Sequence, residues 1–419
     1  MDLAARWNEF RTGFSRTFWV ANTLELFERF SFYGSKIVLA VFLAETVGLG
    51  PLGISLVGFY GFAVFCLPTI AGPFVDRFGF RRSLAACFAI FSVGYFLIAL
   101  AGIPAASGVV ASIGPKVWVV GALLVTAIGG SLIKPCIVGT VARTTTRETK
   151  SLGYSVYYTL VNVGGWLGPI FASQVRVSAG IAWVLVGASA MSFLLFLSTL
   201  AFFTEPEGAP EGERRTLAAV FRDAALVFRN VRFLAFLAIL SVFWVMFWQV
   251  YDLFPFYVRD VLHVPRFELI GSLEAFSVIL LTVPVSALTR RLRPLVAMTA
   301  SFAFAGSSWV LLLLFPSWQA AAGAMFLLAF GEVLQAPRFY EYVADLAPKD
   351  QVGTFMGFAF LPVAVGALLA GPLGSFLVTR YIKGPRGPAG AWITLSAIGL
   401  AGTVAMVLYD RFVAGPREA

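Results

Sequence analysis

The first long apolar run of the chain, at about residues 17–47, contains the sequence Glu25-Leu-Phe-Glu28-Arg29-Phe-Ser-Phe-Tyr33-Gly-Ser-Lys36. At helical spacing Glu25 and Arg29 are i,i+4 neighbours, and Lys36 continues the face of Arg29. A charge near the centre of a lipid bilayer costs several kcal/mol unless it is paired or hydrated. The charged stripe therefore predicts a membrane helix that faces a water-filled cavity. The alternative is a Glu25 to Arg29 pair that only stabilises helix packing.

The composition points the same way. The 419 residues are 59% hydrophobic and only 13% charged, with a mean hydropathy of +0.85. Soluble globular proteins carry roughly 25% charged residues, so this composition excludes a water-soluble enzyme. Because one membrane crossing takes ~20 apolar residues, about twelve crossings would use ~240 residues and leave short connections. The chain therefore has the composition of a multi-pass membrane protein.

Apolar runs recur on both sides of one polar segment. They lie at about 17–47, 53–76, 83–104, 115–142, 152–177, 179–203, 231–258, 267–289, 294–315, 318–344, 352–379 and 388–410. We expect an all-α membrane protein with twelve transmembrane helices. They would form an N-terminal six-helix bundle (1–203) and a C-terminal six-helix bundle (231–419), joined by a cytoplasmic linker (204–230). Two self-contained halves require no partner chain, so we expect a monomer.

Lys and Arg residues are distributed unevenly between alternate connections. Most of the 31 fall in connections on the side of the membrane that also holds both chain ends. The connections on the other side hold Lys116, Arg176, Arg259, Arg266, Arg380, Lys383 and Arg386. By the positive-inside rule, both termini are expected to be cytoplasmic, in a plasma-membrane protein. Topology thus explains the net charge of +9, and binding of nucleic acid is set aside.

The connection after the second run carries a more specific pattern. It reads Gly72-Pro-Phe-Val-Asp76-Arg77-Phe-Gly79-Phe-Arg81-Arg82, which resembles the G-x-x-x-D-R-x-G-x-R-R/K signature of the major facilitator superfamily. Glycine permits close helix approach, and Asp and Arg side chains can form charge pairs that lock one state of a carrier. Asp76 and Arg77 are therefore candidate gating residues, unless the loop is only a basic cytoplasmic connection.

Five motifs, in order along the chain, resemble those of the proton-dependent oligopeptide transporter family, which takes up di- and tripeptides. The first is the E-x-x-E-R-F-x-[YF]-Y-G pattern from Glu25 to Gly34. The others are Gly130-Ser-Leu-Ile-Lys134-Pro135 (G-x-x-x-K-P), Tyr157-Tyr158-x-x-Val161-Asn162-x-Gly164 (F-Y-x-x-I-N-x-G), Phe243-Trp244 before Gln249 (F-W-A-x-x-[DE]-Q), and Gly331-Glu332 to Pro337 with Leu346-Ala347-Pro348 (G-E-L-x-x-S-P and L-A-P). The resemblance implies a major facilitator fold and proton-driven peptide uptake.

The same residues suit a peptide without reference to the family. A zwitterionic peptide carries a carboxylate and an ammonium group, so its binding cavity needs cations on one side and an anion on the other. Arg29 and Lys134 in the N-terminal half supply cations, and Glu332 in the C-terminal half supplies the anion. Binding would then bridge the two halves at the bilayer midplane. The candidates for backbone hydrogen bonds and apolar walls are Tyr33, Tyr158, Asn162 and Trp244.

Each candidate also has a purely structural interpretation. Lys134, beside Pro135, could snorkel at a helix end, and Asn162 could hold two helices together. The tyrosines could belong to interfacial aromatic belts, and Glu332 could pair with Arg338. The sequence leaves these alternatives open.

Proton symport requires a carboxylate that exchanges its proton with both compartments. Glu25 and Glu28 lie within one helical turn of Arg29. Our coupling hypothesis is that protonation of one acid frees Arg29 to bind the substrate carboxylate. The family resemblance implies the same assignment and adds Lys134 to the relay.

Departures from the family pattern affect two candidate sites. Trp248 stands where the family has an acid before Gln249, so a gate pair with Lys36 has either shifted one turn to Asp252 or been lost. Glu274 stands where the family has Asn in S-x-N-P, and an extra acid there favours cationic substrates or supplies another proton site. The linker is also too short for the two helices that many bacterial members insert.

The sequence therefore predicts a bacterial proton-coupled symporter that imports di- or tripeptides or peptide-like solutes by alternating access. An exporter of drugs or metabolites with the same fold is the first alternative, and the direction of transport discriminates the two. A membrane-embedded enzyme is less favoured because no H-E-x-x-H or G-x-S-x-G motif occurs. His263, Cys66, Cys87 and Cys136 form no ligand pattern, so we expect neither a metal nor another cofactor.

Overall fold

The computed structural model describes residues 13–206, 217–348 and 351–414, and within these ranges the chain is helical and contains no β-strand. The long helices before the linker are α2 (Arg16–Val41), α3 (Pro51–Cys66), α4 (Pro68–Phe78), α5 (Phe80–Leu100), α7 (Pro115–Ser131), α8 (Ile133–Thr144), α9 (Lys150–Ala179) and α10 (Ile181–Phe202). Those after it are α12 (Val231–Asp252), α15 (Leu273–Thr289), α16 (Pro294–Leu314), α17 (Trp318–Leu346), α19 (Leu361–Leu377) and α20 (Ala389–Tyr409). Shorter elements include α6 (Ser107–Ile113), α11 (Leu217–Arg229), α14 (Phe267–Gly271), α18 (Val352–Gly357) and the π-helical turns η1 (Phe42–Thr46), η3 (Tyr257–Val261) and η4 (Val378–Ile382).

Every apolar run predicted from the sequence forms helix. Nine helical segments of the described residues are long and apolar enough to cross a membrane, and α3 with α4, taken as one bent span, makes a tenth. α2 and α9, at 26 and 30 residues, are long enough to cross a membrane, but they are not among these segments because they are less apolar or more highly charged. The all-α membrane fold is confirmed, while twelve crossings and cytoplasmic chain ends stay predictions.

The described residues group into two compact units. The first unit lies within residues 1–35 and 67–219, and the second within 36–66 and 220–419. α3 belongs to the second unit because it packs along α19. Their backbones come so close that a Cβ atom on Gly58 would lie 2.7 Å from the Cα atom of Gly371. Contacts therefore divide the chain differently from the two predicted halves, which follow chain order.

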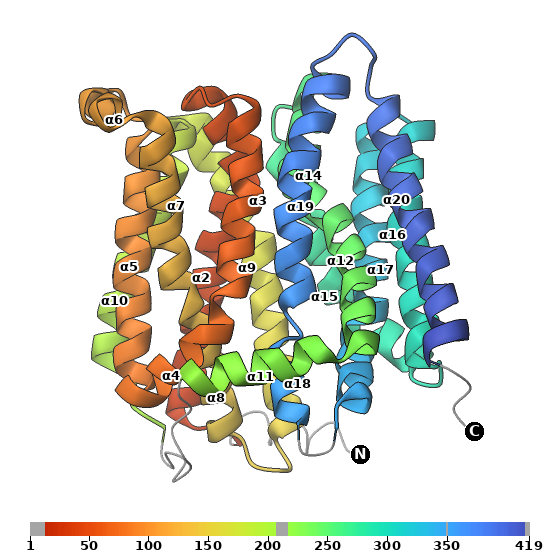
Figure 1. Cartoon of the computed structure of the whole chain (residues 1–419). Coiled ribbons are helices and arrows are strands. Elements are labelled where there is room, and N and C mark those ends of the chain that lie inside the picture. Colours follow the sequence, from red (N-terminus) through yellow and green to blue (C-terminus); the bar gives the residue numbers. More distant parts are fainter. Residues whose placement is uncertain (1–12, 207–216, 349–350, 415–419) are drawn as a thin grey trace. The chain divides into compact units, whose positions relative to one another are not determined.

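In the first unit, α5 packs against both α7 and α10 (Figure 1). α2 and α9 approach closely at glycines. A Cβ atom on Gly164 would lie 2.6 Å from the carbonyl oxygen of Leu26, and one on Gly34 would lie 2.9 Å from that of Gly168. Because no side chain separates the two helices there, polar side chains of α9 reach the charged stretch of α2.

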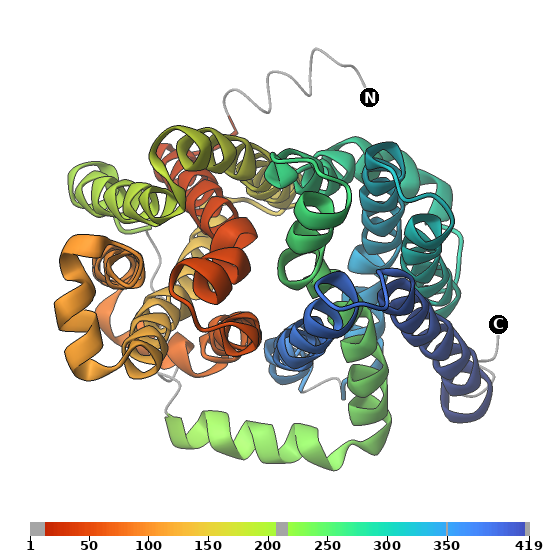
Figure 2. The same ribbon diagram turned by 90° about the horizontal axis from the view of Figure 1, so that it is seen from above.

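In the second unit, α16 packs against α17 and α20, and α12 packs against α19 and α20. Trp309 of α16 stacks on Trp392 of α20, with the ring centres 5.6 Å apart. α11 lies crosswise to α12 (Figure 2). Asn230 lies between these two helices and caps the N-terminus of α12. Its side chain accepts a hydrogen bond of 3.0 Å from the backbone N–H of Phe233. Of the predicted linker, residues 207–216 lie outside the described residues.

Candidate functional sites

A buried ionic cluster occupies the middle of α2. Glu25, Glu28 and Arg29 are 0%, 2% and 3% exposed. Arg29 Nε donates a hydrogen bond to Glu28 and lies 3.6 Å from Glu25 Oε1. The predicted i,i+4 neighbours are thus in contact. Because these charges are removed from solvent, their mutual pairing must compensate the cost of desolvation.

Lys134 brings a second cation to this cluster from another helix. α7 ends at Ser131 and α8 begins at Ile133, and Pro135 stands in the first turn of α8, where its missing N–H breaks no helical hydrogen bond. Lys134 Nζ lies 2.8 Å from Glu25 Oε1 and 2.6 Å from the hydroxyl oxygen of Tyr157 on α9. Lys134 therefore joins the cluster of α2 rather than snorkelling at a helix end.

The cluster carries no net charge when its two acids and two cations are all ionised. Glu25 Oε2 and Glu28 Oε1 are buried and accept no hydrogen bond from the described residues. A proton can therefore be added to either oxygen without displacing a described hydrogen bond. The cluster would then carry one net positive charge, which attracts an anion such as a carboxylate.

The other predicted residues of the first unit surround this cluster more loosely. The guanidinium carbon of Arg29 lies 5.9 Å from the ring centre of Tyr33. Asn162 Nδ2 donates to the carbonyl oxygen of Tyr158 at 2.9 Å, one turn back on α9. Sequence reasoning assigned no role to Tyr157, although the Tyr157-Tyr158 pair was part of a recognised motif. Its hydroxyl contacts both Lys134 and, at 3.4 Å, Glu25 Oε1.

In the second unit, Lys36 lies buried among aromatic rings. Its ammonium nitrogen is 4.0 Å from the ring centre of Trp248, 5.7 Å from that of Tyr251 and 5.9 Å from that of Tyr60. Asp252, which is 2% exposed, interacts electrostatically with Lys36. Of the two alternatives left open by the sequence, the structure therefore supports the shifted pair: the acid lies one turn further on, and Trp248 packs against the cation.

Two acids of the second unit also meet. Glu274 of α15 is 5% exposed, and its carboxyl group interacts electrostatically with that of Glu332 on α17. Two buried carboxylates repel each other when both are ionised, so a proton or a bound cation would stabilise the two acids. Arg338 does not compensate them: its guanidinium donates to Glu341 at 2.6 Å and to the carbonyl oxygen of Thr289 at 2.7 Å. The alternative that Arg338 pairs with Glu332 is wrong.

Trp244 belongs to an aromatic cluster on α12. Its ring centre lies 5.0 Å from that of Phe247 and 6.2 Å from that of Trp248. Trp248 in turn donates its indole N–H to the carbonyl oxygen of Val363 on α19 at 3.1 Å. The predicted apolar wall at Trp244 is therefore continuous with the rings around Lys36.

A further ionic network, which the sequence did not reveal, joins three connections of the second unit. Arg259 donates to both carboxylate oxygens of Glu45, at 2.8 and 2.7 Å, and to Asp260 at 2.6 Å. Lys383 Nζ lies 2.5 Å from Glu45 Oε1. Arg259 and Lys383 entered the sequence reasoning only as charges that mark topology, because chain order does not show that η1, η3 and η4 meet.

The candidate gating residues Asp76 and Arg77 lie at the end of α4. The guanidinium of Arg77 lies 5.4 Å from the ring centre of Phe78, and neither residue forms an ion pair within the described part of the chain. Glu205 instead orders the next helix: its carboxylate accepts hydrogen bonds from the backbone N–H groups of Phe80 and Arg81, at 2.6 and 2.9 Å. An acid at the N-terminus of a helix such as α5 is electrostatically favourable.

Comparison with known proteins identifies the class. The profile of the Major Facilitator Superfamily matches residues 23–361. The chain therefore belongs to this superfamily of membrane transporters, as the signature around Asp76 predicted, and it is a multi-pass protein of the bacterial plasma membrane.

Individual relatives within the superfamily include peptide permeases and a cation/proton antiporter. A dipeptide and tripeptide permease A of Cronobacter turicensis is 26% identical over 227 residues, which cover 51% of this chain and 42% of the permease. A Na⁺, Li⁺, K⁺/H⁺ antiporter of Planococcus maritimus is 24% identical over 376 residues, covering 83% of this chain and 86% of the antiporter. The permeases confirm the resemblance to the proton-dependent oligopeptide transporter family that the five motifs carry.

The fold agrees with that family. The crystal structure of an auto-inhibited peptide transporter of the same family superposes with a TM-score of 0.78 at 18% identity. The superposition covers 97% of this chain and 98% of the other. At 18% identity the likeness concerns the fold alone.

Proposed function

We propose that the protein is a proton-coupled symporter that imports di- and tripeptides or peptide-like solutes by alternating access. The observation that carries the proposal is the cluster of Glu25, Glu28 and Arg29, which are buried, with Lys134, which is 24% exposed. It combines carboxylate oxygens that are open to protonation with two cations suited to a substrate carboxylate.

Coupling follows from the charges of this cluster. A proton that binds Glu28 cancels its ion pair with Arg29, and the guanidinium becomes available for the carboxylate of the substrate. Lys134 would relay in the same way, because a proton on Glu25 weakens its 2.8 Å contact with Lys134 Nζ. Release of the proton restores the internal pairs and expels the substrate carboxylate. Proton and peptide therefore move in the same direction.

The second unit supplies groups that suit the other end of a peptide. Glu332 and Glu274 would accept hydrogen bonds from the substrate ammonium group. Tyr33, Tyr158 and Asn162 of the first unit would bond the peptide backbone, and Trp244 would contact its side chains. The proposed gating residues are Lys36 and Asp252 in the second unit, and Asp76 and Arg77 at the end of α4.

Uptake by proteoliposomes tests the proposal. With an alkaline interior, labelled dialanine should accumulate above its external concentration. Glu28→Gln should abolish this accumulation but retain counterflow exchange of dialanine, because substrate binding survives while proton release does not. Concentrative uptake that is unchanged in Glu28→Gln would contradict the coupling step. If dialanine neither enters nor binds while another solute does, the substrate assignment is wrong.

Cation and proton antiport is the second candidate, since the Planococcus antiporter is similar over 83% of this chain. The same vesicles discriminate the two functions. An antiporter would release protons from acid-loaded vesicles when external Na⁺, Li⁺ or K⁺ is added without peptide. A peptide symporter would move protons inward only with the peptide.

A further inference from the structure

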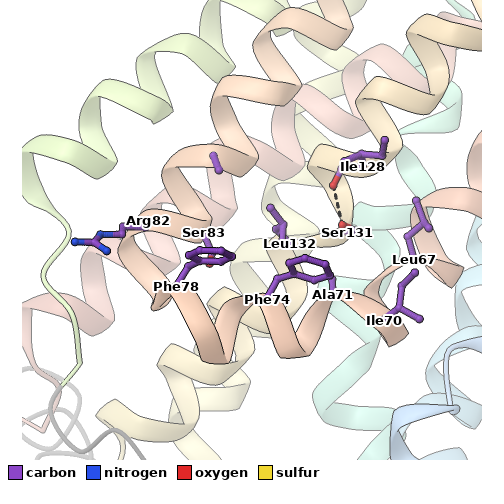
Figure 3. A pocket seen from close by; sticks show the side chains of 11 residues that line it. Leu67, Ile70, Ala71, Phe74, Phe78, Arg82, Ser83, Ile128, Ser131 and Leu132 are labelled. Carbon is purple, nitrogen blue, oxygen red and sulfur yellow. Dashed lines mark hydrogen bonds between the residues drawn. The ribbon is translucent and has the colours of Figure 1, made fainter. Parts of the chain in front are cut away.

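The first unit contains a groove whose lining includes no residue of the ionic cluster, with a volume of about 520 Å³. α4 and the start of α5 form one wall, and the junction of α7 with α8 forms the other. Figure 3 shows Leu67 and Ile70 at one end and Arg82 at the other, with Phe74 and Phe78 between them. The volume falls within the roughly 300–1,000 Å³ of small-molecule sites.

The lining is apolar except at the Arg82 end. Phe74, Phe78 and Ile128 are 47%, 50% and 52% exposed. Ser131 presents little polarity, because its hydroxyl donates to the carbonyl oxygen of Ile128 at 2.7 Å (Figure 3). A peptide would find no carboxylate here for its ammonium group. The lining instead suits a long apolar chain that carries a negative charge at one end.

The guanidinium of Arg82 forms no ion pair with the described residues. Its side chain is exposed. Its neighbour Arg81, by contrast, donates to the carbonyl oxygen of Leu200. The distribution of Lys and Arg predicts that this end of the unit is cytoplasmic, where anionic lipid headgroups create a negative surface potential.

We propose that this groove binds one anionic phospholipid, with an acyl chain along Phe74 and Phe78 and the phosphate group on Arg82. The acyl chain covers aromatic and aliphatic surface that α4 and α7 leave exposed. The guanidinium binds phosphate oxygens with the paired geometry that lysine lacks. The groove and the proposed peptide site share no side chain, so either assignment can fail without the other.

Lipid titration of the full-length, delipidated protein tests this site by native mass spectrometry. Dioleoyl phosphatidylglycerol should bind about tenfold more tightly than dioleoyl phosphatidylcholine, and Arg82→Gln should remove this preference. Arg147→Gln is the matched control, because Arg147 is exposed in the connection between α8 and α9, outside the groove. It should change the affinity less than twofold. Ala86 also lines the groove, so Ala86→Phe should fill it and lower the binding of both lipids there.

Each other result overturns the proposal. Equal affinity for both lipids would show that any acyl chain fills the groove without recognition of its headgroup. Equal losses in Arg82→Gln and Arg147→Gln would show diffuse attraction to the basic end of the protein. Unchanged binding in Ala86→Phe would place the lipid elsewhere.

Discussion

The ammonium nitrogen of Lys36 lies 4.0 Å from the centre of the Trp248 ring. Trp248 occupies the position at which the oligopeptide transporter family has an acid, and Asp252 carries the negative charge one turn later. The face of an aromatic ring stabilises a desolvated cation by ~2 kcal/mol. Although Trp248 stands in place of an acid, Lys36 therefore still has an attractive contact at this position.

Removal of one partner of the buried Lys36 and Asp252 pair should destabilise the protein. Asp252→Asn leaves the buried ammonium of Lys36 without the carboxylate with which it interacts electrostatically, so we expect a loss of about 1–3 kcal/mol. The double variant Lys36→Met with Asp252→Asn should recover most of this loss, because neither charge then remains. Unfolding of the purified variants in detergent measures both effects. Losses that simply add in the double variant would argue against a direct pair.

Tyr157 should act in proton coupling and Tyr158 in substrate binding. Tyr157→Phe removes the hydroxyl that lies 2.6 Å from Lys134 Nζ, at a cost of about 1 kcal/mol, so uptake driven by a pH gradient should fall about fivefold. Counterflow exchange should change little. Tyr158→Phe is the matched control and should raise the KM for dialanine in both assays. Equal behaviour of the two variants would remove the distinction between them.

Glu274 should set the preference for positively charged substrates. Glu274→Asn restores the family residue and leaves Glu332 as the acid for the substrate ammonium group. Uptake of lysyl-alanine relative to dialanine should then fall about tenfold, which corresponds to ~1.4 kcal/mol. Competition between the two peptides for uptake measures the ratio. A constant ratio with lower proton-driven accumulation would instead identify Glu274 as a proton site.

The network around Glu45 should stabilise the second unit modestly. Glu45→Gln removes the bidentate contact with Arg259 and the contact with Lys383. Since these side chains are partly exposed, we expect a loss of about 1 kcal/mol that shrinks in high salt. Glu148→Gln, in the exposed connection between α8 and α9, is the control and should have no effect on the melting temperature.

The helices could be predicted from the sequence because hydropathy is local. Each apolar run forms helix, and the spacing of Glu25 and Arg29 correctly indicated their contact. Contacts between helices are not local, so the meeting of Glu45 with Arg259, and the grouping of α3 with α19, could not be predicted. Helical periodicity also gives the face of Tyr157 on α9, but it does not identify the lysine on α8 that this face meets.

The junction at Leu132, where α7 ends and α8 begins, has a consequence for reconstitution. Ser131 and Leu132 line the proposed lipid site, and Lys134 follows them by two or three residues on the way into the ionic cluster. A lipid bound in the groove would therefore contact the α7–α8 junction, whose backbone positions Lys134 in the ionic cluster. Turnover measured in neutral lipid alone would then describe a transporter whose relay lysine is held less firmly than in the cell.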